Sequence, residues 1–289
     1  RGCRYHVRQW GTPTPDATPL VLAHGWMDVA ASWQFMVDAL SQAFAAQRPI
    51  IAMDWRGFGL TEAPPTESYW FPDYLADLDA LLDQLYPGQA IDLVGHSMGG
   101  NVVMLYAGTR PERIRRLVNL EGFGMPATRP AQAPTRMGQW LDELKAQREG
   151  ANALKPYANA AGVAARLMKT NCRLNPDKAN WLATHWAQPG SDGQWRILGD
   201  SAHKVINPYL FQVEEALEMY RRITAPVLAV EAADDSLGQW WKGRYTLAEF
   251  HERLKSVPTL EQAVIQDAGH MLHHDQPAAL AARLEKFLA

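Results

Sequence analysis

The residue of this sequence best suited to chemistry is a serine flanked by glycines. Ser97 lies in the stretch Gly95-His96-Ser97-Met98-Gly99-Gly100, after an apolar run at 91–94 and before a helical pattern from Asn101 to Thr109. A Gly-x-Ser-x-Gly turn between a strand and a helix holds the serine on a strained backbone with its hydroxyl exposed. Because the flanking glycines leave room for so tight a turn, we expect Ser97 to be a nucleophile.

A serine hydroxyl is a poor nucleophile at neutral pH and needs an adjacent base. Of the nine histidines, His270 is the best placed, because it lies in Asp267-Ala268-Gly269-His270, just past the last expected strand. His96 is expected to point away from the serine, and His24 to pack or hydrogen-bond nearby. Surface or capping roles are expected for His273 and His274, which lie where the closing helix begins.

Two loops offer the carboxylate that would orient His270 and support its charged form. Asp235, preceded by Asp234, follows the expected strand 226–230, and Glu121 follows the expected strand 114–120. Both loops should open at the carboxyl edge of a parallel sheet, where sites in open α/β folds form. We favour Asp235, retain Glu121 as its rival and place Asp234 third. The structural alternative for Glu121 is a polar residue at a strand end.

Short apolar runs alternate with helical patterns along the first 120 residues, which indicates a parallel sheet covered on both faces. The pattern then changes, and residues 124–220 contain no convincing buried strand. The expected strands are 20–23, 49–53, 91–94, 114–120, 226–230 and 263–265. The expected helices of the interruption lie near 137–149, 156–170 and 177–187, with a fourth that runs from Asn207-Pro208 to about Arg222.

The order serine, acid, histidine resembles that of the α/β-hydrolase fold superfamily, in its lidded branch of esterases and epoxide hydrolases. The resemblance covers nearly the whole chain and rests on His24-Gly25-Trp26, Asp54-Trp55-Arg56-Gly57-Phe58-Gly59, the turn at Ser97, the loop ending at Asp235, and Gly269-His270. It implies a core of residues 1–124 and 221–289, with a helical lid of residues 125–220. It also implies an oxyanion hole made by the backbone N–H groups of Trp26 and Met98.

Two departures from the family pattern bear on the reaction. Haloalkane dehalogenases and epoxide hydrolases of this branch carry aspartate at the turn, so Ser97 disfavours their reactions and favours acyl transfer. Val118-Asn119-Leu120-Glu121 resembles the segment that carries the acid in some haloalkane dehalogenases. Ala232 stands where many members have glycine in the loop that leads to Asp235.

Eleven tryptophans suggest aromatic pocket walls as well as core packing. The candidates for substrate contact are Trp26, Trp140, Trp181 and Trp186, with Trp240 and Trp241 also considered. An apolar pocket with few polar groups favours a neutral hydrophobic substrate. We therefore expect a serine hydrolase of small or medium hydrophobic esters or thioesters. The alternatives are a C–C bond hydrolase of diketone-type substrates and a receptor-like ligand-binding protein with little turnover.

The composition of the chain limits which other partners and cofactors we expect. The 28 basic and 31 acidic residues give a net charge of −3, which disfavours nucleic acid. Cys3 and Cys172 form neither a disulfide scaffold nor a zinc pattern, and we expect no metal or cofactor. No apolar run approaches the roughly 18–20 residues of a membrane span, and no signal peptide is visible before or after Trp10. We expect a cytoplasmic monomer or homodimer, although the chain starts at Arg1 and its natural start can be missing.

Overall fold

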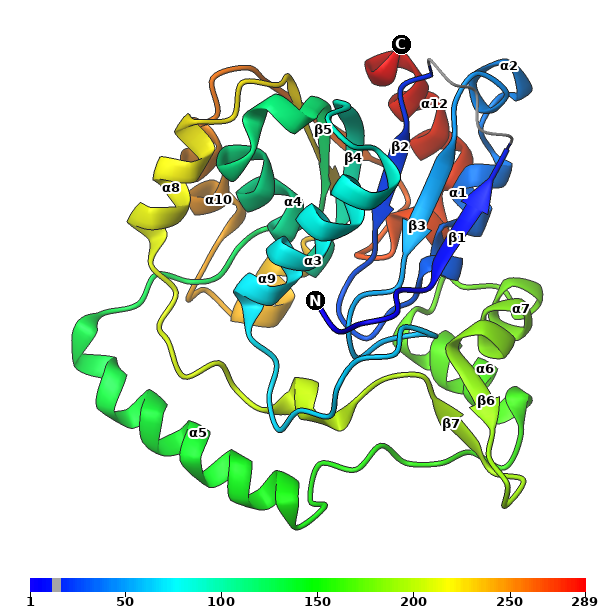
Figure 1. Cartoon of the computed structure of the whole chain (residues 1–289), viewed down its shortest axis with the longest axis vertical. Coiled ribbons are helices and arrows are strands. Elements are labelled where there is room, and N and C mark those ends of the chain that lie inside the picture. The colour runs from blue at the N-terminus through cyan, green and yellow to red at the C-terminus, as the bar shows by residue number, and fades with distance from the viewer. Residues whose placement is uncertain (12–16) are drawn as a thin grey trace.

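The computed structural model describes residues 1–11 and 17–289, in which a seven-stranded sheet forms the centre. The strand order is β1-β3-β2-β4-β5-β8-β9, and every neighbouring pair is parallel except β1 and β3. Figure 1 shows this twisted sheet between layers of helices. The strands are β1 (Val7–Trp10), β2 (Leu20–Ala23), β3 (Ile50–Met53), β4 (Ile91–His96), β5 (Ile114–Leu120), β8 (Val227–Ala232) and β9 (Leu260–Ile265).

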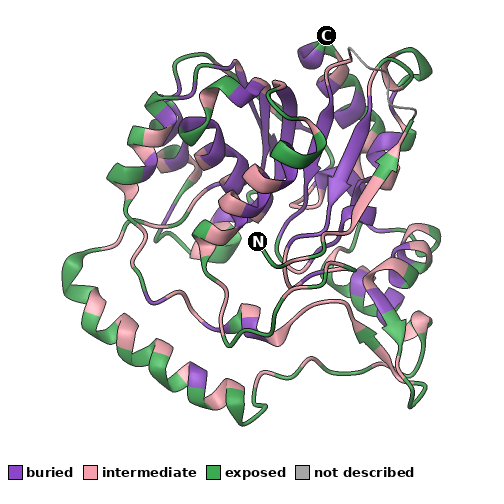
Figure 2. Ribbon diagram, in the orientation of Figure 1, coloured by how far each residue is buried: buried purple, intermediate pink, exposed green. Residues whose placement is uncertain are grey.

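Apolar residues on both faces of the sheet explain why helices cover both sides. Alternate side chains of a strand point to opposite faces, so Val21 and Ala23 join one hydrophobic cluster while Leu20 and Leu22 join the other. All four are fully buried, and Figure 2 shows the central strands as the most continuously buried part of the molecule. Such unbroken apolar runs are typical of parallel strands.

Each face has its own set of helices. The cluster that contains Val21 is covered by α3 (Phe71–Leu85), α4 (Met98–Thr109) and α10 (Leu247–Leu254). The cluster that contains Leu22 is covered by α1 (Gln34–Asp38), α11 (Leu272–Asp275) and α12 (Pro277–Leu288), next to the short 3-10 helix η1 (Ala30–Trp33). Two further short helices are α2 (Gln42–Ala45) and α9 (Ser236–Trp241), and η2 (Pro111–Arg113) precedes β5.

The chain between β5 and β8 forms an insert outside the sheet. It holds η3 (Pro130–Gln132), α5 (Ala133–Arg148), α6 (Ala160–Thr170), α7 (Pro176–Trp186), β6 (Ala187–Pro189), β7 (Trp195–Ile197), η4 (Ser201–Lys204) and α8 (Val213–Arg221). In Figure 1, α5 runs along the bottom of the molecule, well away from the sheet, whereas α6 and α7 lie beside β1. A small apolar cluster built on α6 and α7 stabilises that half of the insert.

The structure differs from the sequence expectations in a few elements. The helix expected from Asn207 begins only at Val213, because the Asn207 side chain accepts a hydrogen bond from Tyr209 N in a local turn instead. The sequence did not predict three features of the structure: the antiparallel edge strand β1, the helix α9 and the small β6–β7 pair. In the part of the chain that the structure describes, no helix has the length and apolar character needed to cross a bilayer.

Candidate active site

Ser97 lies on the turn between β4 and α4 in a conformation that serine rarely adopts. Its φ is 54° and its ψ is −116°, which places it among the backbone outliers that gather at functional sites and cost of the order of 1–3 kcal/mol. The turn is tight because a Cβ at Gly99 would overlap the carbonyl oxygen of Ala23. Two backbone hydrogen bonds fix it, from Ser97 N to Leu120 O at 2.8 Å and from Asn101 N to Ser97 O at 3.0 Å.

His270 lies beside this turn and is held there by the residue that precedes the serine. The rings of His96 and His270 lie 4.7 Å apart, and His96 Nε2 donates to the carbonyl oxygen of His270 at 2.7 Å. The Trp240 ring meets the His270 ring edge to face at 4.3 Å. His270 therefore has few alternative orientations.

Glu121 is the carboxylate that His270 contacts. Nδ1 of His270 lies 3.2 Å from Glu121 Oε2, and Glu121 Oε1 accepts a hydrogen bond from Ala232 N at 2.8 Å. Glu121 follows β5 directly, is 3% exposed and has a positive φ of 55°. Asn119 holds this turn with two hydrogen bonds to Gly122, each 2.9 Å long.

Burial disfavours a charge on either partner of this pair. It lowers the pKa of His270 to about 3, so the resting imidazole is neutral and can accept a proton. Burial also raises the pKa of Glu121 to about 7, against hydrogen bonds from Ala232 and Ser236 that favour the carboxylate. The charges of Asp235 and Asp234 raise the pKa of Glu121 further.

The structure places the other two carboxylates in different roles. Asp235, the acid favoured from the sequence, is exposed and caps α9, where its Oδ1 accepts from Gly238 N at 2.7 Å. Asp234 pairs with Arg173 of the insert at 2.6 Å. The sequence carried a signal for the cap, because Asp-Ser-Leu-Gly has an N-cap residue followed by a helical start. The geometry therefore favours Glu121, the rival candidate, as the partner of His270.

Of the two backbone groups suggested for an oxyanion hole, that of Met98 follows the serine directly. Met98 is the first residue of α4, so its N–H has no partner within the helix. Gly25, which precedes Trp26, lies so close to the turn at Ser97 that a Cβ on it would be 3.1 Å from the Cβ of Ser97. The half-exposed Trp26 side chain, 51% accessible, is thus next to the site.

Of the tryptophans proposed as pocket walls, two belong to packing between the insert and the core. Trp181 meets Phe35 edge to face at 5.4 Å, and Trp186 Nε1 donates to Ser32 Oγ at 3.3 Å. Trp140 lies on the remote helix α5. Trp240, with 47% of its surface exposed and its ring against His270, is the tryptophan that the contacts place in the site.

Two of the other histidines discussed from the sequence have environments that the sequence did not reveal. His273 and His274 are only 1% and 2% exposed, so the surface roles expected for them are wrong. Both lie on α11, whose inner face packs against η1 and α1. His24 does hydrogen-bond near the site as expected, since its Nε2 accepts from Trp55 N at 3.0 Å.

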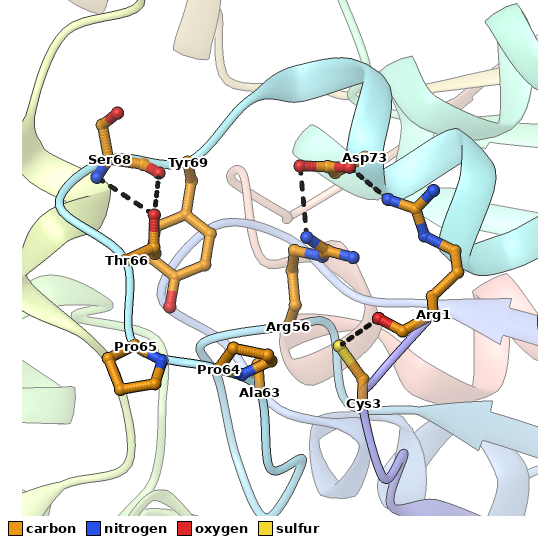
Figure 3. A pocket seen from close by; sticks show the side chains of 10 residues that line it. All are labelled: Arg1, Cys3, Arg56, Ala63, Pro64, Pro65, Thr66, Ser68, Tyr69 and Asp73. Carbon is orange, nitrogen blue, oxygen red and sulfur yellow. Dashed lines mark hydrogen bonds and ion pairs between the residues drawn. The ribbon is translucent and has the colours of Figure 1, made fainter.

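A separate hollow lies near the N-terminal segment (Figure 3). Its lining does not include Ser97, His270 or Glu121. Arg56 on its wall pairs with Asp73 and Asp77, and Arg1 pairs with the same two carboxylates. Because the charged groups of this hollow neutralise one another, we assign them a structural role.

Residues 18–277 match the model of the α/β hydrolase fold family, so the chain belongs to that family. A serine hydrolase-like protein of Danio rerio is 23% identical over 283 residues, which span 96% of this chain and 83% of that protein. These similarities identify the protein as a hydrolase of the α/β-hydrolase fold.

Two solved structures share the fold over almost their whole length. The thioesterase domain from the curacin biosynthetic pathway superposes with a TM-score of 0.81 at 23% identity, covering 98% of this chain and 96% of that domain. A hypothetical protein of Pseudomonas aeruginosa PAO1 superposes with a TM-score of 0.80 at 27% identity, covering 98% of this chain and 93% of the other.

Proposed function

We propose that the protein is a serine hydrolase that cleaves a carboxylic ester or thioester of a small or medium hydrophobic substrate. The observation that carries the proposal is the pairing of His270 with Glu121 beside a serine held at a positive φ. A neutral, oriented imidazole next to a strained serine is the arrangement that activates a hydroxyl for attack on an acyl carbon.

In this mechanism Ser97 Oγ attacks the carbonyl carbon while His270 Nε2 takes its proton. Glu121 orients the ring and stabilises the imidazolium through Nδ1–H. The N–H groups of Met98 and Trp26 stabilise the developing oxyanion. The imidazolium then protonates the leaving alcohol or thiol, and a water molecule, deprotonated by His270, hydrolyses the acyl-enzyme. The carboxylic acid leaves and Ser97 regains its proton.

The segment of residues 125–220 is the lid of this enzyme, joined to the core of residues 1–124 and 221–289. Its contacts with the core, among them Arg173 with Asp234 and Lys178 Nζ with His274 O at 2.6 Å, tie it down beside the site. The exposed aromatic surfaces of Trp26 and Trp240 favour an apolar substrate.

The test combines labelling with turnover. Wild-type protein should react with a fluorophosphonate at Ser97, located by peptide mass spectrometry, and should hydrolyse p-nitrophenyl esters and acyl thioesters of two to eight carbons. Ser97→Ala should abolish both while its melting temperature stays unchanged. Labelling without turnover of any ester or thioester would overturn the substrate class and favour either C–C bond hydrolysis or ligand binding. Absence of labelling in folded protein would overturn the serine mechanism.

A further inference from the structure

A second cluster of reactive side chains lies in the core behind Ser97. Asp28 follows β2, His96 ends β4, and His273 lies on α11, so three separate parts of the chain meet here. One donor atom from each lies within 4.8 Å of the other two, and Asp28 Oδ2 is 3.9 Å from His273 Nε2. The three residues are 3%, 1% and 1% exposed.

The donor atoms of this cluster have no hydrogen-bond partner among the described residues. They are Asp28 Oδ2, His96 Nδ1 and both ring nitrogens of His273. Buried polar atoms are nearly always paired, and each exception calls for an explanation, such as a bound water or ion. Several unpaired acceptors directed at one place in the core indicate a common ligand.

The contacts on the outer side of the cluster orient the donors. His96 Nε2 donates to His270 O at 2.7 Å, which leaves Nδ1 with its lone pair toward the cluster. Asp28 Oδ1 accepts from Val29 N at 2.8 Å and from Ser32 Oγ, which leaves Oδ2 free. Metal-bound histidines usually donate their other ring N–H to a carbonyl or carboxylate, and metal-bound carboxylates are usually hydrogen-bonded. Two of the three residues show this pattern.

The local charge also favours a cation. Asp54 accepts from Ala30 N at 2.7 Å, two residues after Asp28, and is itself 2% exposed. Asp54 pairs with His6 Nδ1 at 2.7 Å, whereas the nearest histidine nitrogen paired with Asp28 among the described residues is that of His273, 3.9 Å away. A divalent cation would balance the charge of Asp28. An uncompensated charge in the core is costly, whereas a neutralised group of charges is much less so.

We propose that Asp28, His96 and His273 bind one divalent transition-metal ion of the Zn²⁺ type. Two imidazoles and one carboxylate suit Zn²⁺ and its neighbours, and not Ca²⁺ or Mg²⁺, which prefer oxygen ligands. Donors about 2.0–2.1 Å from a tetrahedral Zn²⁺ lie roughly 3.3 Å apart, so Asp28 and His273 must approach by about half an ångström. Water completes the coordination as the fourth ligand.

The ion would have a structural role. It would connect the loop next to Trp26, the strand that ends before Ser97, and the helix that follows His270. It would therefore stabilise the frame of the active site without contacting the substrate. This inference does not depend on which bond the enzyme cleaves. Sequence analysis did not predict this metal site, because the three residues are far apart in the chain.

The test measures metal content and stability. Protein stripped with a chelator is refolded from urea with and without one equivalent of Zn²⁺, separated from free metal and analysed by elemental mass spectrometry. We expect one Zn²⁺ per chain, and a melting temperature raised by about 3–5 °C at Zn²⁺ concentrations 100 times Kd. Wild-type protein that folds without retaining Zn²⁺ would overturn the proposal and assign the unpaired atoms to buried water.

Variants locate the ion. Asp28→Asn and His273→Gln should each lose the bound Zn²⁺ and the thermal shift. The control, His251→Gln, removes a partly exposed histidine that pairs with Glu231 and should retain both the bound Zn²⁺ and the thermal shift. If a folded His273→Gln keeps one Zn²⁺ per chain, or if His251→Gln loses it, the proposed site is wrong. Co²⁺-loaded wild-type protein gives a measurement independent of variant folding, because tetrahedral nitrogen and oxygen coordination produces strong visible absorption. Absence of these bands would also overturn the site.

Discussion

Glu121 Oε2 lies 3.2 Å from His270 Nδ1, while the other oxygen of the same carboxylate accepts from the backbone N–H of Ala232. Glu121, which follows β5, is thereby fixed by the neighbouring strand β8. It contacts His270, which follows β9. The three adjacent strands β5, β8 and β9 thus place one hydrogen-bonding contact beside Ser97.

This relationship predicts which carboxylate matters for turnover. Glu121→Gln should lower kcat by roughly 10⁴-fold, the loss seen when the acid of a serine triad becomes an amide. Asp235→Asn should change kcat only a few-fold. Because asparagine caps a helix as well as aspartate does, the free energy of unfolding should also stay the same. Steady-state hydrolysis of an activated ester by both variants checks this. A large loss for Asp235→Asn with normal Glu121→Gln would restore the sequence-based preference.

The contact between Trp240 and His270 predicts a smaller effect. Trp240→Ala removes an edge-to-face contact worth about 0.5–1.5 kcal/mol, so the base loses part of its orientation and kcat should fall about 2- to 10-fold. Trp240→Phe should recover most of the loss because it keeps a ring in the same place. Trp70→Ala, which removes another partly exposed tryptophan packed against Tyr209, serves as the control. Equal losses in Trp240→Ala and Trp70→Ala would argue against a positioning role.

The tight turn at Ser97 predicts that position 99 has no room for a side chain. A methyl group there would overlap the carbonyl oxygen of Ala23, and since backbone cannot easily move, Gly99→Ala should lower the free energy of unfolding by about 1–3 kcal/mol. Gly138 in α5 has open space around it. Gly138→Ala should therefore raise the free energy of unfolding by up to about 1 kcal/mol. Urea unfolding compares the two, and an unchanged midpoint for Gly99→Ala would contradict the described turn.

His203 predicts how stability depends on pH. Its ring is stacked between Phe58 and Tyr69, at 3.8 and 3.6 Å, and burial lowers its pKa to about 3. Above pH 6.5 the imidazole of His203 is neutral in both the folded and the unfolded protein, so it adds no pH dependence to the free energy of unfolding. Below pH 6.5 the unfolded chain binds a proton that the folded protein does not. The free energy of unfolding should therefore fall by up to about 1.4 kcal/mol per pH unit between pH 6.5 and 3 through this residue.

His203→Phe keeps an aromatic ring in the stack but removes the titrating group. Urea unfolding of both proteins between pH 4 and 7 should give a shallower acid slope for the variant. Parallel slopes would show that His203 is protonated in the folded protein.

The sequence alone determined the class of fold and the position of Ser97 on a tight turn between a strand and a helix. Short strand candidates of three to seven residues that alternate with helical periodicity leave little choice except a parallel sheet covered on both faces. The glycines around Ser97 specify a turn that few other residues could form. These features are local, so they can be read from neighbouring residues.

Tertiary structure decided which carboxylate contacts His270, which aromatic ring packs against it, and the environment of His273. Glu121 and Asp235 both follow strands that end at the same edge of the sheet, and their order in the chain cannot show which one reaches His270. That choice depends on the capping bond from Gly238 N to Asp235 and on the turn that directs Glu121 inward. Contacts between residues more than a hundred positions apart depend on strand order and side-chain direction, which only the folded chain defines.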